Sequence, residues 1–355
     1  MTPRWNPAHR KVRDAWGTRQ WQSGSTPREL NREGLVYIPI PPVKVLRRRA
    51  SFQGGIYTTL KRCSAITPMS AMEKLESFFR SLPQTIYWPS ELAAIFQKHR
   101  SLWKLPHEMT FPSFVTWLQQ KRKLTKIRLT SPRYPEIMRY AWGLRPSPVL
   151  VALSTKRESY FSHRSALWVH GIGGNGTELY VNQEQREKPP NDASSLTQES
   201  VNRVFKNNQR QTKLIYQYEK ERITIVNGKH TNRLGVVPRV APTGEPVEVT
   251  CIERSLIDAT VRPVYAGGVS GVLAAFKAAR SKVSIKKLVT LLETLDYTYP
   301  YHQAIGFYLK RSGYSGREQE LLRKMGFALD FYLSHGIKDP QLDGDWRCFY
   351  PRGLK

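Results

Sequence analysis

The sequence predicts an α+β protein with two folded parts, and three observations support this prediction. Residues 70–145 contain three short helix patterns followed by an alternating, basic strand pattern. Residues 146–355 contain strand patterns in their first half and helix patterns in their second half. The composition changes at Pro146-Ser147-Pro148, where we place the domain boundary. A length of 355 residues suits two or three domains, and a hydrophobic content of 40% is enough to form cores.

The first folded part begins with a helix signal. Ser70 and Glu73 have the spacing of a capping box, and apolar residues at helical spacing follow them. A second helix is predicted to begin near Pro89, and a third follows Thr110. The alternation over residues 124–129 then predicts a strand, which leads into a turn.

Three helices followed by a basic β-ribbon is the order of a winged helix-turn-helix. In that fold the third helix enters the major groove of DNA and the wing contacts phosphates. The residues around the third helix and the ribbon are of types that reach base edges or phosphates, although a solvated basic face is the alternative interpretation. The predicted DNA-binding residues are Thr110, Ser113, Thr116, Gln119, Gln120, Lys121, Arg122, Lys123, Lys126, Arg128 and Arg133.

The charge of the chain also favours nucleic acid. Lys and Arg number 56 against 28 Asp and Glu, which gives a net charge of +28 and favours a polyanionic partner. Residues 1–69 carry 13 basic and 3 acidic side chains, and we interpret them as a basic, poorly ordered arm. A second hypothesis places the start of translation at Met69 or Met72, just before the first helix.

Several classes of protein are excluded by composition. Three widely spaced cysteines predict neither a disulfide framework nor a thiolate zinc cluster. No apolar run reaches the ~18–20 residues of a membrane span, and no secretory signal follows Met1, so we expect a soluble, cytoplasmic protein without a membrane partner. The histidines form no metal motif, and we predict no metal and no cofactor.

The second folded part begins with strands and ends with helices. Asn227-Gly228 is interpreted as a hairpin turn, and residues 182–200 as a polar loop. Ser162 is predicted to cap a short helix that runs through Leu167 to His170. The G-x-G-x-x-G letters at 171–176 follow this helix and precede a strand. This is the reverse of the order in a dinucleotide site, and we therefore expect a turn. The other predicted strands and helices cover residues 179–181, 213–218, 222–226, 247–249, 253–261, 268–280, 284–295, 302–312 and 346–350.

The densest group of chemically active residues lies at 251–268. Arg254 and Asp258 are spaced i, i+4 and can form an ion pair within one helix. Pro263 is expected to end that helix, and Gly267-Gly268 permits a sharp turn into the next. This pattern is also how two helices are simply joined and packed. Glu248 on a strand is not followed by the E-x-K pattern of a nuclease, so we predict no catalytic residues.

Two segments of the second part resemble the AbiEi family, the antitoxins of bacterial type IV toxin–antitoxin (abortive infection) operons. Residues 162–171 have the pattern S-H-x-S-A-L-x-x-H-G, and residues 253–268 have the pattern E-R-x-x-I-D-x-x-x-R-P-x-Y-A-G-G. The resemblance extends over residues 70–355. It carries over the motif positions Ser162, His163, Ser165, His170, Glu253, Arg254, Asp258, Arg262, Tyr265, Gly267 and Gly268.

The resemblance implies an N-terminal winged helix-turn-helix and, over residues 146–355, an antitoxin domain. Such proteins bind inverted repeats in their own promoter, repress the operon, and counter a nucleotidyltransferase toxin encoded beside them. Inverted repeats favour two copies on double-stranded DNA. We therefore expect a repressor and antitoxin that is not an enzyme. The alternatives are a nuclease-like, DNA- or RNA-processing enzyme of a defence system, and a protein-binding module whose charge only keeps it in solution.

Overall fold

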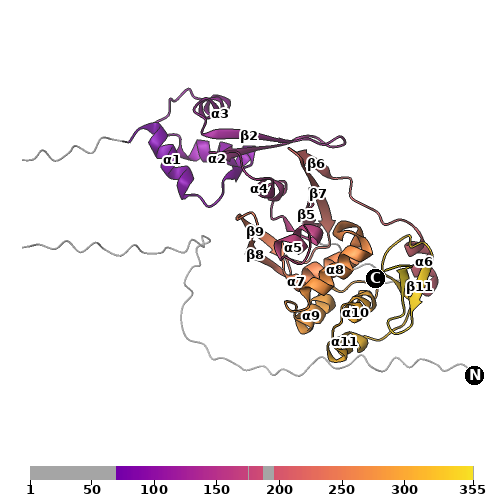
Figure 1. Cartoon of the computed structure of the whole chain (residues 1–355). Coiled ribbons are helices and arrows are strands. Elements are labelled where there is room, and N and C mark those ends of the chain that lie inside the picture. Colours follow the sequence, from indigo (N-terminus) through magenta and orange to yellow (C-terminus); the bar gives the residue numbers. More distant parts are fainter. Residues whose placement is uncertain (1–68, 175, 187–195, 355) are drawn as a thin grey trace, which may run out of the picture. The chain divides into compact units, whose positions relative to one another are not determined.

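A computed structural model describes residues 69–174, 176–186 and 196–354 of the chain. These residues form a mixed α+β protein, as the sequence predicts (Figure 1). The basic arm predicted for residues 1–69 lies outside the described residues, apart from Met69. None of the described helices combines the length and the apolar composition that crossing a membrane requires.

Three helices begin the described chain, at the places where the sequence predicts them. They are α1 (Ala71–Ser81), α2 (Pro89–His99) and α3 (Phe111–Gln120). The capping box of α1 is formed, because Ser70 Oγ accepts from the N–H of Glu73 at 3.3 Å and the Glu73 carboxylate accepts from the N–H of Ser70 at 2.7 Å.

An antiparallel sheet of three strands accompanies these helices, in the order β1 (Ile86–Tyr87), β3 (Ile137–Trp142) and β2 (Leu124–Leu129). Aromatic rings hold the helices on it. The rings of Phe79 and Trp142 stack with centroids 4.1 Å apart. Trp103 and Phe114 are both buried in the same core. These contacts join residues that are far apart in the chain, so the three helices and the sheet are packed around one core.

A six-stranded mixed sheet forms the centre of the second part (Figure 1). Its order is β6-β7-β5-β4-β9-β8. The pairs β5–β7 and β4–β9 are parallel, and the other neighbours are antiparallel. The bounds are β4 Tyr160–Phe161, β5 Glu178–Glu184, β6 Ile215–Tyr218, β7 Glu221–Gly228, β8 Val236–Val240 and β9 Pro246–Thr250. Two short helices, α4 (Pro148–Leu153) and α5 (His163–Val169), pack on this sheet.

The rest of the second part is mainly helical. Helix α6 (Gln198–Lys206) precedes β6, and the remaining helices follow β9. They are α7 Ile252–Val261, the 3-10 helix η1 Pro263–Ala266, α8 Gly268–Ala279, α9 Ile285–Leu295, α10 Tyr301–Arg311 and α11 Gly316–Arg323. A small sheet near the end of the chain has the order β10 (Phe331–Tyr332), β12 (Cys348–Pro351) and β11 (Pro340–Asp343).

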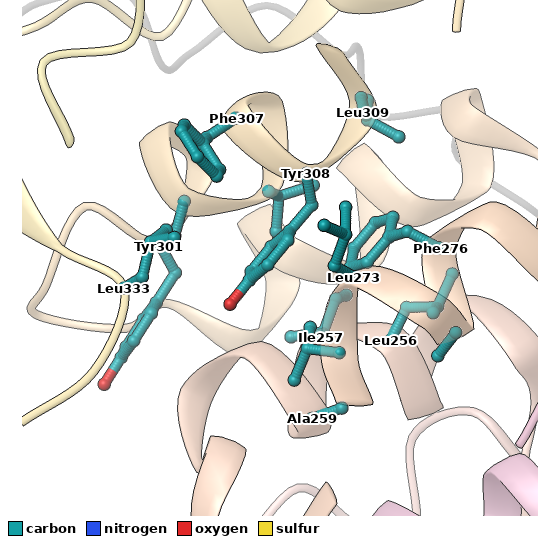
Figure 2. Packing of buried hydrophobic residues seen from close by; sticks show 14 of the residues in the cluster. Leu256, Ile257, Ala259, Leu273, Phe276, Tyr301, Phe307, Tyr308, Leu309 and Leu333 are labelled. Carbon is teal, nitrogen blue, oxygen red and sulfur yellow. The ribbon is translucent and has the colours of Figure 1, made fainter. Parts of the chain in front are cut away.

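The core of the helical half is closely packed around α7, α8 and α10 (Figure 2). The rings of Phe276 and Tyr308 stack with centroids 5.2 Å apart, above Leu256 and Ile257 of α7. Helix α7 is buried on nearly all sides, including its polar residues. It is therefore the element on which the sheet and the other helices assemble.

The hairpin predicted at Asn227-Gly228 is wrong. These two residues are the last two of β7, and the tight turn lies at the other end of that strand, where Tyr218 pairs with Glu221. Gly228 is needed for another reason, since a Cβ at this position would lie 2.6 Å from the side chain of Asn182 on the neighbouring strand β5. The glycine therefore makes room for a side chain rather than for a turn.

The polar loop predicted for residues 182–200 is shorter than expected. Strand β5 continues to Glu184, and helix α6 starts at Gln198. The polar residues at the end of β5 are used in hydrogen bonds: Tyr160 donates to the carboxylate of Glu184 at 3.0 Å and Asn182 donates to Tyr160 at 2.6 Å. Polar composition therefore indicated a loop where a buried polar network forms.

The β2–β3 ribbon packs on both cores. Leu124 belongs to the core of the three helices, whereas Ile127 and Leu129 of the same strand belong to the core of the six-stranded sheet. The described residues on the two sides of position 146 thus share a core. They also belong to one compact unit, Ile66–Lys355.

Arg139 on β3 fixes this junction. Its guanidinium donates to the carbonyls of Ser154 at 2.8 Å and Thr155 at 2.9 Å, and lies over the ring of Trp88 at 3.6 Å. The side chain is buried, and burial lowers its pKa to about 10. A buried guanidinium that contacts two separate segments, residues 154–155 and Trp88, fixes the ribbon against the end of α4.

Candidate functional site

The predicted DNA-binding residues on α3 fall into two groups. Thr110 and Ser113 form the N-terminal cap, because the Thr110 Oγ accepts from the N–H of Ser113 at 3.4 Å and the two hydroxyls lie 2.9 Å apart. Thr116 and Gln120 are exposed, and Gln119 is half-buried. The hydroxyls of Thr110 and Ser113 thus form hydrogen bonds at the N-terminus of the helix, whereas the side chains of Thr116 and Gln120 face solvent.

The turn after α3 carries three of the predicted cations. Lys121 and Arg122 are exposed, and Arg122 has a φ of +55°, which turns the chain sharply out of the helix. Lys123 differs, since its Nζ lies 2.7 Å from the carboxylate of Glu76 on α1. The hydrogen bond to Lys123 lowers the pKa of Glu76, so this carboxylate stays ionised at neutral pH. Lys123 therefore ties β2 to α1 as well as adding charge.

Strand β2 presents the remaining cations on its solvent side. Lys126 and Arg128 are exposed and alternate with buried apolar residues. Arg133 is exposed in the turn between β2 and β3. Together with Lys121 and Arg122, these residues form no ion pair with any other residue that the structure describes. The exposed cations extend from the end of α3 along the whole ribbon.

The motif residues of the second part lie together around α5 and α7, although about eighty residues separate the two segments. Several of them hold the backbone. Ser165 Oγ accepts from the N–H of Tyr180 at 2.8 Å, which fixes α5 on β5. His170 Nε2 donates to the carbonyl of Thr250 at 2.6 Å, which fixes the end of α5 on the end of β9.

Glu253 and the glycines also have packing roles. The Glu253 carboxylate accepts from the N–H of Ser284 at 3.1 Å and pairs with Lys287 at 2.9 Å, so it connects α7 to the start of α9. Burial raises the pKa of this carboxyl, but the hydrogen bond from Lys287 and the other donors outweigh it, and the net pKa is lowered. Gly267 and Gly268 have φ of +83° and +73°, so they make the predicted turn between η1 and α8.

Four other motif residues line a small polar cavity. It has a volume of about 60 Å³, and His163, Arg254, Asp258 and Arg262 are among its lining residues. The predicted ion pair is formed, with Arg254 Nε 2.8 Å from Asp258 Oδ1 and both side chains nearly fully buried. Arg254 Nη1 also donates to the carbonyl of Leu234 at 3.0 Å. Two guanidinium groups, an imidazole and a carboxylate therefore converge at one place.

Burial and neighbouring charge fix the protonation of these groups. Burial lowers the pKa of His163 well below its usual value, and the guanidinium groups of Arg262 and Arg254 lower it further. Burial also lowers the pKa of Arg254, but the Asp258 carboxylate outweighs it and raises the net pKa. The site therefore contains a neutral His163 imidazole beside a charged Arg254 guanidinium.

His163 has an unusual backbone and a fixed ring. Its φ is +50°, and the Oγ of Ser162 lies 2.8 Å from Nδ1. The ring of Tyr265 meets it edge to face, with centroids 5.4 Å apart. The predicted cap of α5 by Ser162 is wrong in one respect, because its hydroxyl bonds to this imidazole and not to the helix backbone. The Ser-His pair of the motif is thus a local hydrogen-bonded unit.

Three further polar lining residues were not predicted as site residues from the sequence: Asn182 on β5, Lys229 after β7, and Tyr297 after α9. Asn182 was assigned to the start of the predicted polar loop, and nothing in the local sequence marks it as part of a site. Among the described residues, no three His, Cys, Asp or Glu lie close enough to hold a metal ion. The cavity has room for a few water molecules, and its polar groups join α5, α7 and β5.

No family model matches the chain, and no curated protein matches it. Among solved structures, the RV2827C protein from Mycobacterium tuberculosis is similar to this chain with a TM-score of 0.50. The two are 12% identical, and the match covers 79% of this chain and 90% of that one. At this identity the likeness concerns the fold alone.

Proposed function

We propose that the protein is a DNA-binding repressor and antitoxin of a bacterial type IV toxin–antitoxin system, with residues 70–145 acting as a winged helix-turn-helix. The observation that carries the proposal is the row of exposed cations from Lys121 at the end of α3 to Arg133 at the tip of the ribbon. A helix end followed by a basic strand pair is the arrangement that reads a groove and grips phosphates. The net charge of +28 agrees with this partner.

The antitoxin role rests on the two motif segments. Their residues pack against each other around α5 and α7, with the Arg254–Asp258 pair and His163 at the centre. A polar network that is buried and shared between distant segments specifies one arrangement of the second domain. We infer that this domain counters a nucleotidyltransferase toxin encoded beside the gene, while the first domain binds the promoter.

DNA binding is tested with the full chain and the DNA upstream of its gene. With ~6 phosphate contacts, the affinity should fall about 10³-fold between low and moderate salt, because each contact releases condensed counterions. Lys277→Ala/Lys286→Ala, which removes two exposed cations from α8 and α9, is the matched control and should bind as the unchanged chain does. Binding that is absent, or insensitive to salt, would contradict the proposal.

The antitoxin role is tested by co-expression with the neighbouring gene. If that gene encodes a nucleotidyltransferase that stops growth, this chain should restore growth. A neighbour of another class, or no rescue, would contradict this half of the proposal. Incubation with plasmid DNA and RNA in the presence of Mg²⁺ distinguishes the nuclease-like alternative, because a binding protein leaves both intact.

A further inference from the structure

The β2–β3 ribbon continues into the six-stranded sheet through Thr130 and Gln217. The N–H of Gln217 donates to the carbonyl of Thr130 at 2.7 Å, and the N–H of Thr130 donates to the carbonyl of Gln217 at 3.1 Å. Gln217 of β6 is also paired with Arg222 of β7. Because directly paired residues of a sheet point to the same face, these three side chains share one face.

The same face carries two cations of the proposed DNA-binding surface. Arg128 and Lys126 lie two and four residues before Thr130 along the strand, and side chains two residues apart point to the same side. All these side chains, with Gln217 and Arg222, are exposed, whereas the alternate residues on the other face are buried in the core. The exposed face therefore runs without a break from the ribbon to β7.

A groove of about 440 Å³ lies at this junction. It is lined by cations from three separate segments, by hydroxyl groups, and by the apolar side chains of Pro132, Ile215 and Tyr216. Arginine, lysine and hydroxyl groups are the donors with which proteins hold the phosphates of a nucleic-acid backbone. The lining donors are Arg133 of the β2–β3 turn, Lys213 before β6, Arg222 of β7, and the hydroxyls of Thr130, Ser131 and Thr212.

The cations of the second domain are held in position by their neighbours. The N–H of Thr212 donates to the hydroxyl of the motif residue Tyr265 at 2.7 Å, and the carbonyl of Leu214 accepts from the N–H of Ile225 at 2.9 Å. Lys213 stands between these two anchored residues. Arg222 Nε lies 3.2 Å from the carboxylate of Glu178, in a pair whose arginine side chain remains half exposed. The groove is thus built on fixed backbone.

We propose that bound DNA extends past the ribbon onto β6 and β7, where Arg133, Lys213 and Arg222 hold its phosphates. This inference rests on the proposed DNA-binding function and adds the second domain to the binding surface. The six residues of β2 span about 20 Å, which corresponds to about six base pairs at ~3.4 Å each. The added contacts lie on the backbone, so they extend the binding site without reading sequence.

The test compares two duplexes from the upstream DNA. The long duplex covers the region that the full chain protects from hydroxyl radicals, and the short duplex lacks six base pairs at each end. Lys213→Ala/Arg222→Ala should bind the long duplex about tenfold more weakly than the unchanged chain, with a salt slope smaller by about two. On the short duplex the two proteins should agree within twofold. The control Lys277→Ala/Lys286→Ala should behave as the unchanged chain on both duplexes.

The outcomes separate the inference from the proposed function. If the unchanged chain binds the long duplex and the double variant binds it equally well, the extension is wrong and the proposed function stands. An equal loss of affinity on both duplexes also overturns the proposed extension of the binding site, because the weaker binding then does not depend on the terminal base pairs. If the unchanged chain binds neither duplex, the proposed extension and the proposed DNA-binding function are both wrong. Thermal unfolding checks that Lys213→Ala/Arg222→Ala is folded. If that variant is unfolded, Lys213→Gln/Arg222→Gln, which keeps hydrogen-bonding side chains, takes its place in the test.

Discussion

Arg254 and Asp258, one turn apart on α7, form an ion pair of 2.8 Å with both side chains nearly fully buried. A pair in this position is costly to break, because the remaining partner is a charge without water or counterion. The pair also lies at the centre of the motif residues. Its contribution to the free energy of unfolding can be measured apart from any function.

Breaking the pair should cost about 3–5 kcal/mol of the free energy of unfolding in Arg254→Met or Asp258→Asn. Arg254→Met/Asp258→Asn should lose less than the two single losses together, since it leaves no buried charge. Denaturant unfolding measures all three. The control is Arg80→Ala, which breaks the exposed i, i+4 pair with Glu76 and should cost below ~1 kcal/mol. Additive losses in the double variant would show that the two groups are not coupled.

Stability should fall as the pH is lowered below about 6.5, because burial and two arginines lower the pKa of His163. The unfolded chain binds a proton near pH 6.5 and the folded chain does not, so protonation favours unfolding in this window. His163→Asn suits the left-handed backbone at this position. This variant should reduce the pH slope between pH 5.5 and 6.5 by up to ~1.4 kcal/mol per pH unit. His170, His302 and His335, whose pKa values are also lowered, contribute a slope of the same sign. An unchanged slope would contradict the assignment.

Gly306→Ala on α10 should destabilise the protein although alanine favours helices. A Cβ at Gly306 would lie 2.0 Å from the indole of Trp346, which is fully buried. Overpacking of this kind costs ~1–3 kcal/mol or more. Gly316→Ala at the start of α11 is the matched control, because no atom lies within 4 Å of its Cβ; it should be neutral or slightly stabilising. Equal melting temperatures for the two variants would show that Trp346 can move aside.

Lys121→Ala/Arg122→Ala/Lys123→Ala should release repression of a promoter reporter and leave toxin neutralisation unchanged. Loss of both activities would contradict separate roles for the two domains. The single substitutions within this set should differ in their effect on stability. Lys121→Ala should only lower the salt dependence of DNA binding, by about one unit of slope. Lys123→Ala should also lower the melting temperature slightly, because it leaves Glu76 without the partner at 2.7 Å.

The helices were predictable where the signals are local. Ser70 with Glu73, Thr110 and Ser284 cap the helices that the sequence predicts at these places, and Gly267-Gly268 makes the predicted turn. Caps and turns depend on a few neighbouring residues, so their chemistry is visible in the chain itself. The i, i+4 spacing of Arg254 and Asp258 likewise predicted their ion pair.

The predictions from sequence that are wrong or missing concern residues whose role depends on a partner that is distant in the chain. Asn227-Gly228 has the letters of a hairpin, but Gly228 makes room for Asn182 across the sheet. Helix α6 begins at Gln198, inside the segment that was predicted as a polar loop, and its buried face is only two residues, Val201 and Phe205. Tyr297 and Lys229 enter the polar cavity from loops, and nothing in their local sequence indicates it.

The sequence by itself determined the class of the fold, the positions of most helices, the concentration of charge before residue 145, and the two motif segments. Tertiary structure alone decided that these segments surround one polar cavity and that the ribbon joins the six-stranded sheet at Thr130 and Gln217. The physical reason is the distance along the chain over which each kind of interaction acts. Caps, periodicity and charge act over one or two turns of chain, whereas strand pairing and burial depend on residues that only folding brings together.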